Sequence, residues 1–227
     1  MKNIFLYGTL FFSLFALAQN EMDFVPKNWK VIAKTQGDLN ADKIDDLVLV
    51  IEDTNKENFI SNDRLGETTL NTNPRFLLVL FKNSENKFYL DKKNKIAIPP
   101  GGNIESTCLE DPFLSGKGIQ ISRGLLKLSL RYFLSCGSWE INVNDYTFRF
   151  QNNQFVLIGY DTFSIHRSSG EIEESSYNFL TKKKSITKGE NEFFPNKSKA
   201  KTQWSKIDAK NELTFSNIGK NIDFGWQ

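Results

Sequence analysis

The chain has 227 residues, a formal net charge of +2 at pH 7 and 25% charged residues. This near-neutral balance argues against a nucleic-acid-binding protein and against attachment to a membrane by polybasic attraction. The 20 Phe, 6 Tyr and 4 Trp suffice for a hydrophobic core, and the length favours one domain or two small ones.

Residues 1–18 have the features of a secretory signal peptide. Lys2 supplies the positive charge, residues 4–17 are apolar, and Ala16-Leu17-Ala18 matches the small-x-small cleavage pattern. An apolar run of this length reaches only about 21 Å as a helix, whereas a bilayer core is about 30 Å thick, which argues against a membrane anchor. We therefore expect a single domain, residues 19–227, that is periplasmic or secreted and has no membrane span after signal removal.

An acidic segment separates a predicted strand at residues 29–34 from an apolar strand at 47–52. Calcium loops supply oxygen ligands from side chains at positions one, three, five and nine and from a backbone carbonyl at position seven. At that spacing the candidate ligands of a structural Ca²⁺ ion are Asp38, Asn40, Asp42, the carbonyl of Ile44, and Asp46. Asp45, at position eight, is expected to face solvent. The alternative is an Asx-rich turn that keeps the loop shape without an ion.

At these residues the chain resembles the calcium loop of the FG-GAP and VCBS repeats, the units of integrin-like β-propellers. In those repeats an Asp-x-Asn-x-Asp-x-x-Asp-Asp stretch runs directly into an apolar strand, as it does here at residues 38–46. Strands predicted at 76–81 and 87–89 match the rest of such a blade. The resemblance covers residues 29–98 and implies one blade-like unit with a structural calcium ion. The whole chain is also loosely similar to small exported bacterial proteins that carry one such loop.

The loop departs from the family at positions four and six, where Ala41 and Lys43 replace the usual glycines. A positive φ at position six would cost a non-glycine residue on the order of 1 kcal/mol. Position twelve holds Leu49 instead of the bidentate glutamate of an EF-hand. Both departures predict weak calcium binding.

The middle of the chain is expected to contain two long loops. Residues 53–73 are polar and predict a surface excursion, and a second loop at 99–118 contains Cys108. In an exported chain, two cysteines at this spacing most simply form a disulfide, here between Cys108 and Cys136. The alternatives are two free thiols or a nucleophilic thiol assisted by His166.

Residues 118–180 predict a second antiparallel meander. Residues 126–132 alternate strictly between apolar and polar side chains, as expected of a strand with one buried face. The predicted strands of this part are residues 118–122, 125–134, 139–142, 146–151 and 155–166. A turn is predicted at 143–145 and a tight turn at 168–170. Residues 182–201 are rich in lysine and predict a solvated loop, with a basic patch for an acidic partner as the alternative.

The sequence therefore predicts an all-β protein, because no segment has a sustained helical pattern. We expect an antiparallel meander of propeller-like blades, with a β-sandwich as the alternative. The chain is too short for a propeller of four or more blades of this kind, and it contains one copy of the loop.

The motifs favour a non-enzymatic protein, although they do not decide the question. His166 is the only histidine, and neither a Gly-x-Ser-x-Gly elbow nor a metal-ligand pair surrounds it. We therefore expect an exported binding or interaction protein whose partner is an unknown protein or carbohydrate. A periplasmic hydrolase with strand-borne carboxylates and an inhibitor or immunity-type partner of another exported protein are the alternatives. The candidate contact residues are the tryptophans, Trp29, Trp139, Trp204 and Trp226.

Overall fold

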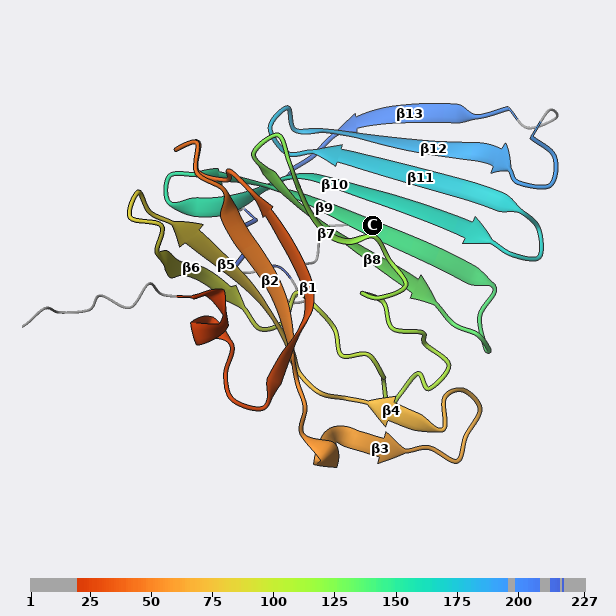
Figure 1. The fold of residues 1–227 in the computed structure, drawn as a ribbon. Helices are drawn as coiled ribbons and strands as arrows, with labels where there is room; N and C mark the ends of the chain where they lie inside the picture. The colour runs from red at the N-terminus through yellow and green to blue at the C-terminus, as the bar shows by residue number, and fades with distance from the viewer. Residues whose placement is uncertain (1–19, 196–198, 209–212, 217, 219–227) are drawn as a thin grey trace, which may run out of the picture.

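The computed structural model describes residues 20–195, 199–208, 213–216 and 218 of the chain. The signal-peptide prediction and Trp226 lie outside these residues. As predicted, the described chain is all-β, with antiparallel sheets of four, seven and two strands. The helical elements are two 3-10 turns, η1 (Glu21–Phe24) and η2 (Lys56–Asn58). Figure 1 shows the two large sheets, with the short hairpin projecting from one end.

The first sheet is a four-stranded meander with the order β1-β2-β5-β6. Its strands are β1 (Trp29–Gly37), β2 (Asp46–Asp53), β5 (Arg75–Lys82) and β6 (Phe88–Asn94). The polar segment between β2 and β5 is the surface excursion that its composition predicts, and it carries the hairpin of β3 (Phe59–Ser61) and β4 (Thr69–Asn71). Strands β2 and β5 are apolar along nearly their whole length because both faces of this sheet are covered.

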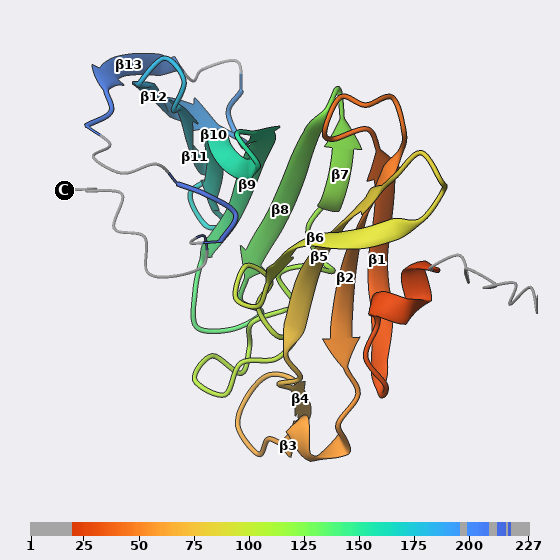
Figure 2. The same ribbon diagram turned by 90° about the vertical axis from the view of Figure 1, so that its left-hand side faces the viewer.

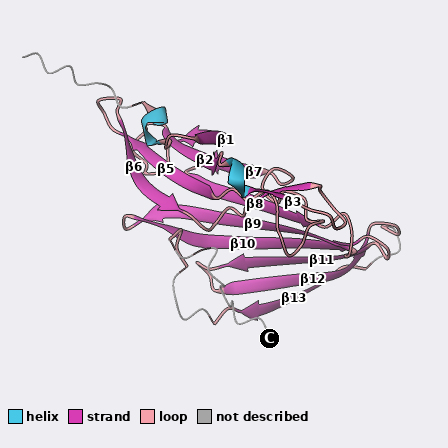
Figure 3. Ribbon diagram, turned by 90° about the horizontal axis from the view of Figure 1, so that it is seen from below, coloured by secondary structure: helices cyan, strands magenta, loops and turns pink. Residues whose placement is uncertain are grey.

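The second sheet has seven antiparallel strands, β7 to β13, and each strand pairs with the strands before and after it in the sequence. Figure 3 shows β8 to β13 side by side as one continuous layer. The strands are β7 (Gly118–Ser122), β8 (Leu125–Phe133), β9 (Glu140–Gln151), β10 (Gln154–His166), β11 (Glu171–Asn178), β12 (Lys183–Asn191) and β13 (Lys201–Lys206).

Two predictions about this sheet are wrong. The turn predicted at 143–145 does not form, because β9 continues through it and pairs with long neighbours on both sides. The lysine-rich run at 182–201 is not a loop throughout, since residues 183–191 form β12 between β11 and β13. Backbone pairing with both neighbours makes this segment a strand. Two of its lysines also contact β11: Lys188 pairs with Glu173 at 2.7 Å, and the Lys184 ammonium lies 5.9 Å from the Tyr177 ring centroid.

The two large sheets share one hydrophobic core. It contains Val48, Val50 and Val79 from the first sheet and Leu128 and Phe148 from the second, together with other buried residues of both. At one edge β1 meets β7, seen side by side in Figure 2, where the Ile121 amide donates to Thr35 Oγ1 at 3.3 Å. This shared core fits the sandwich alternative. The first sheet has the strand number of a propeller blade, whereas the second is wider.

The outer face of the first sheet has its own small core. There the 3-10 turn η1 and the residues after it place Phe24 and Val25 against the side chains of Leu47, Leu49 and other residues of β2 and β5. Over the described ranges, no helix is long and apolar enough to cross a membrane.

Candidate functional site

The acidic loop connects β1 to β2 and folds into a tight curl held by its own side chains. The Asp38 carboxylate accepts hydrogen bonds from the Ala41 amide at 2.7 Å and the Lys43 amide at 2.9 Å. Asn40 Oδ1 accepts from the Asp42 amide at 3.1 Å, and Asp42 Oδ1 accepts from the Ile44 amide at 2.8 Å. The alternating Asx side chains therefore fix the backbone in a series of Asx turns.

Loop positions four and six both adopt the left-handed backbone conformation. The φ angle is 64° at Ala41 and 69° at Lys43. These are the two positions where the FG-GAP and VCBS repeats carry glycine, and a non-glycine residue in this region costs about 1–2 kcal/mol. Hydrogen bonds from the Ala41 and Lys43 amides to the Asp38 carboxylate offset part of this strain.

Asp46, the last ligand candidate, is fully buried at the start of β2. One carboxylate oxygen accepts from the Leu39 amide at 2.9 Å and the other accepts from the Lys82 amide at 3.1 Å. Burial raises the pKa of Asp46 to about 6; the two amide hydrogen bonds oppose this rise, while the charges of Asp42 and Asp38 add to it. A buried carboxylate near two others is a position where a bound cation would be stabilising.

The chemistry of the donor set fits a hard cation such as Ca²⁺. All five candidates offer oxygen, and each carboxylate oxygen that accepts one amide retains a lone pair for an ion. In the described part of the chain, however, no three His, Cys, Asp or Glu side chains are gathered into a ready metal cage. Asp38, Asn40, Asp42, the Ile44 carbonyl and Asp46 are therefore candidate ligands that would have to close around the ion.

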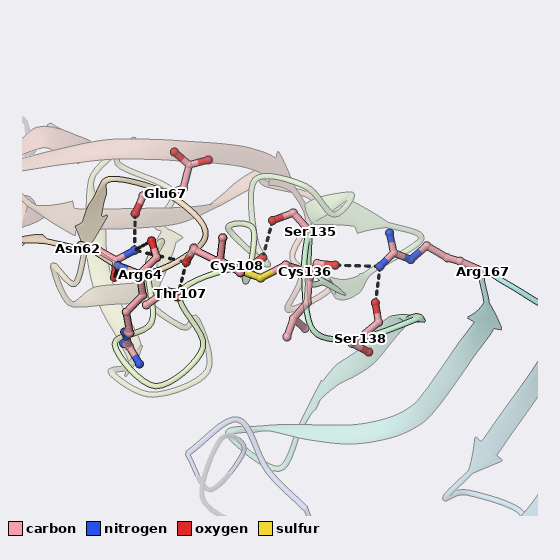
Figure 4. Close-up of a disulfide and its surroundings, with 11 residues drawn as sticks. Asn62, Arg64, Glu67, Thr107, Cys108, Ser135, Cys136, Ser138 and Arg167 are labelled. Carbon is pink, nitrogen blue, oxygen red and sulfur yellow. Dashed lines mark hydrogen bonds between the residues drawn. A yellow bond between two sulfur atoms is a disulfide. The ribbon is translucent and has the colours of Figure 1, made fainter.

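The predicted disulfide between Cys108 and Cys136 is confirmed, and the free-thiol alternatives are wrong. The two Cα atoms lie 5.5 Å apart, and the bridge ties the 99–118 loop to the segment after β8. Figure 4 shows hydrogen bonds on both sides of it. The Ser135 amide donates to the Cys108 carbonyl at 2.9 Å, and Thr107 Oγ1 donates to the Leu65 carbonyl at 2.6 Å. The bridge thus connects the second sheet to the hairpin excursion.

A buried ionic cluster lies at the opposite end of the first sheet from the acidic loop. Arg75 donates to Glu52 at 2.7 Å and, through two nitrogens, to Asp111 at 2.7 and 2.5 Å. Lys30 pairs with the second oxygen of Glu52 at 2.8 Å. A Cβ at Gly101 would lie 2.9 Å from both Arg75 and Asp111, so a larger residue there would displace these two charged side chains. Sequence reasoning missed this cluster; its one signal is that an acidic residue near the end of one apolar strand, Glu52, is followed by a basic residue at the start of the next, Arg75, and the two lie opposite each other.

This cluster predicts a loss of stability in acid. Burial alone would raise the pKa values of Glu52 and Asp111, but hydrogen bonds and charge from Arg75, and from Lys30 at Glu52, lower them below their ordinary values. Carboxylates with lowered pKa values contribute stability above their unfolded pKa values and lose it as the pH falls through the folded ones.

We therefore expect the free energy of unfolding to decline below about pH 4, measured by urea unfolding at several pH values. The raised pKa of Asp46 acts in the opposite direction, but only above its unfolded value of 3.8, so it does not contribute to this decline. A Glu52→Gln variant should decline less steeply. Equal slopes for the variant and the parent would refute the assignment.

The remaining sequence candidates lie apart from one another. His166 ends β10, and its Nδ1 contacts the hydroxyls of Ser168 and Ser169, each at 3.1 Å, within the tight turn predicted there. Trp29 packs on Phe76 with ring centroids 4.3 Å apart, whereas Trp139 and Trp204 are exposed. The structure therefore gathers the acidic-loop residues at one site and joins the two cysteines at another, whereas the tryptophans lie apart from one another.

No protein-family model, curated protein or solved structure matches the chain.

Proposed function

We propose that the protein is an exported, non-enzymatic binding or interaction protein in which a structural calcium ion closes the β1–β2 loop. The observation that carries the calcium assignment is the left-handed backbone at Ala41 and Lys43 within a run of oxygen donors at calcium-loop spacing. Two strained residues in one short loop are costly, and such strain is typical of sites where a defined backbone conformation serves a function.

Two features support the export part of the proposal. The disulfide between Cys108 and Cys136 is weakly consistent with an oxidising compartment outside the cytoplasm. Extracellular calcium modules bind with dissociation constants of about 10⁻⁴–10⁻³ M, so a loop with no bidentate glutamate can still be filled where calcium is abundant.

The binding part rests on exposed side chains of the second sheet. Strands β11 to β13 contribute few buried residues, and on β13 the Trp204 side chain is 70% exposed. An exposed tryptophan supplies a large contact area at low entropic cost, as protein and carbohydrate partners require. These exposed side chains support a partner surface on the second sheet and its edges, away from the first sheet, whose faces are covered.

Calcium added to chelator-treated protein is expected to raise the melting temperature. Free calcium at 100 times its dissociation constant should stabilise by about 2.7 kcal/mol, which corresponds to about 5–10 °C for a domain of this size. Asp42→Ala should abolish the rise. Asp45→Ala is the matched control, because Asp45 lies in the same loop at a position that offers no ligand, and it should leave the rise intact. An unchanged melting curve for the parent protein would leave the loop as a plain Asx turn.

A further inference from the structure

A groove lies on one face of the second sheet, across strands β9 to β12, which Figure 3 shows side by side. Residues directly opposite each other on neighbouring antiparallel strands share a face of the sheet. The register therefore decides which side chains can meet in the groove. One row across the strands consists of Asp145, Asp161, Ser176 and Ser185, and the next row on the same face contains Phe163 and Glu174.

Side-chain contacts agree with this assignment of the face. Ser176 Oγ donates to Asp161 Oδ1 at 2.5 Å, which joins β11 to β10 within the first row. The residues that precede Asp161 and follow Ser176, Tyr160 and Tyr177, point the other way and belong to the core that the two large sheets share. The groove is therefore on the outer face of the second sheet, away from the first sheet.

Three carboxylates meet in this groove. Asp145 and Asp161 lie directly opposite each other, where Cβ atoms are about 4.5–5.5 Å apart and like charges destabilise a sheet. Glu174 is a diagonal neighbour of Asp161, at about 7–8 Å. Over the described ranges, no lysine or arginine forms an ion pair with any of the three. The groove thus concentrates negative charge that the chain itself leaves uncompensated.

The β9 side of the groove also has polar atoms without a partner. Asp145 Oδ1 is shielded from solvent and accepts no hydrogen bond. Ser129, opposite Asp145 on β8, is only 6% exposed, and its Oγ has no partner either. Buried polar atoms without hydrogen bonds are rare, and like charges are seldom set opposite each other in a sheet. Such local costs are typical of binding sites, where function is kept at the expense of stability.

We propose that this groove binds an organic cation, the ammonium or guanidinium group of a small amine or of a lysine or arginine side chain. Asp161 and Glu174 are exposed and contact the cation, and Asp145 adds negative charge beside them. Phe163 supplies an aromatic ring in the same groove. A cation held here relieves the repulsion between Asp145 and Asp161.

The size and the donor set of the groove limit the ligand. Its volume of about 260 Å³ lies below the range of about 300–1,000 Å³ for typical small-molecule pockets, so it accommodates a single cationic group. A bare metal ion fits less well, because in the part of the chain that the structure describes no three acidic side chains are close enough to hold one. Trp204 lies opposite Ser185 on the same face, so a larger partner whose cation enters the groove also meets this exposed ring. The inference rests on the binding role proposed above and names its ligand class.

Titration calorimetry at low ionic strength on residues 19–227 tests the proposal with two cationic probes, putrescine and an acetylated Gly-Lys-Gly-Lys-Gly amide. Butanediol and the same peptide with acetyl-lysines are the matched neutral probes. At least one cationic probe should bind, and more tightly than its neutral counterpart; the better probe identifies a small amine or a protein as the source. Asp161→Asn and Glu174→Gln should each weaken binding by about tenfold, because each removes a charge-assisted hydrogen bond.

A second measurement separates a binding role of Asp161 from a structural one. Asparagine keeps the acceptor for Ser176 but removes the charge opposite Asp145. Asp161→Asn should therefore raise the melting temperature of the ligand-free protein by about 1–3 °C. A fall in the melting temperature would mean that this carboxylate supports the fold, and it would overturn the proposal.

Glu173→Gln is the matched control, since Glu173 lies next to Glu174 on β11 but on the other face, where it pairs with Lys188 at 2.7 Å. This variant should leave affinity unchanged. If Asp161→Asn does not fold, Glu174→Gln still tests the proposal, because Glu174 is exposed.

Absence of binding by both cationic probes, equal binding by the neutral probes, or unchanged affinity of the groove variants would also overturn the proposal. The calcium proposal can fail separately. Amine binding without a calcium-dependent melting shift would refute only the calcium loop, and a calcium-dependent shift without amine binding would refute only this inference.

Discussion

Replacing Arg75 with alanine is expected to lower the free energy of unfolding by about 3–5 kcal/mol. The substitution leaves the Glu52 and Asp111 carboxylates without their guanidinium partner, and Glu52 is only 2% exposed. Removal of one member of a buried ion pair is costly because the remaining charge is desolvated and uncompensated. Urea unfolding followed by tryptophan fluorescence measures the loss.

Arg131→Ala is the control for this experiment. Arg131 also pairs with a carboxylate, Glu110, at 3.4 Å, but both side chains are partly exposed, and such surface pairs contribute about 0–1 kcal/mol. If Arg75→Ala costs no more than Arg131→Ala, the buried cluster does not stabilise the fold. Arg75 also donates to the Pro99 carbonyl at 3.2 Å, so its loss should loosen the 99–118 loop as well.

Removing the disulfide by Cys108→Ser and Cys136→Ser together is expected to cost about 3–4 kcal/mol in the chain-entropy model. The bridge closes a loop with a sequence separation of 28 residues, and its loss enlarges the conformational freedom of the unfolded chain. Comparison of the melting temperatures of the parent and the double variant measures the effect.

Thiol titration of the unfolded parent protein is the companion measurement to this comparison. It should find no free thiol without reductant and two per chain after reduction. The backbone hydrogen bond between Ser135 and Cys108 persists in the double variant and should keep the native arrangement of the loop. A double variant with an unchanged melting temperature would mean that these local contacts, rather than the covalent bond, hold the loop.

The strands were predictable where short-range patterns determine them. The strand at 118–122 is β7 as predicted, and the alternating segment at 126–132 lies within β8. The full length of strand β9 was not predictable, because the local preference of Asn144-Asp145 for a turn is outweighed by pairing of the strand with β8 and β10. Strand β12 was not predictable for the same reason: its lysine-rich sequence favours a loop, and pairing with β11 and β13 makes it a strand.

The acidic loop was predictable because its donors lie within nine consecutive positions and contact one another through local hydrogen bonds. The ionic cluster was not, since Arg75 lies 23 residues from Glu52 and 36 from Asp111 in the sequence. Likewise, no local pattern predicts that the turn at 123–124, between β7 and β8, lies next to residues 37–41. The contact of β1 with β7 brings this turn to the acidic loop.

Strand β13 is the last strand of the described seven-stranded sheet, and every one of its residues is exposed. A terminal strand presents a row of backbone donors and acceptors to which another chain can add. Lys201 and Lys206 lie at the two ends of this strand, and Lys183 and Lys188 face them on β12. A second copy that approached this border would bring its own lysines against these. In the described part of the chain no strand lies beyond β13, so the repulsion between these lysines opposes pairing of this edge with a second copy.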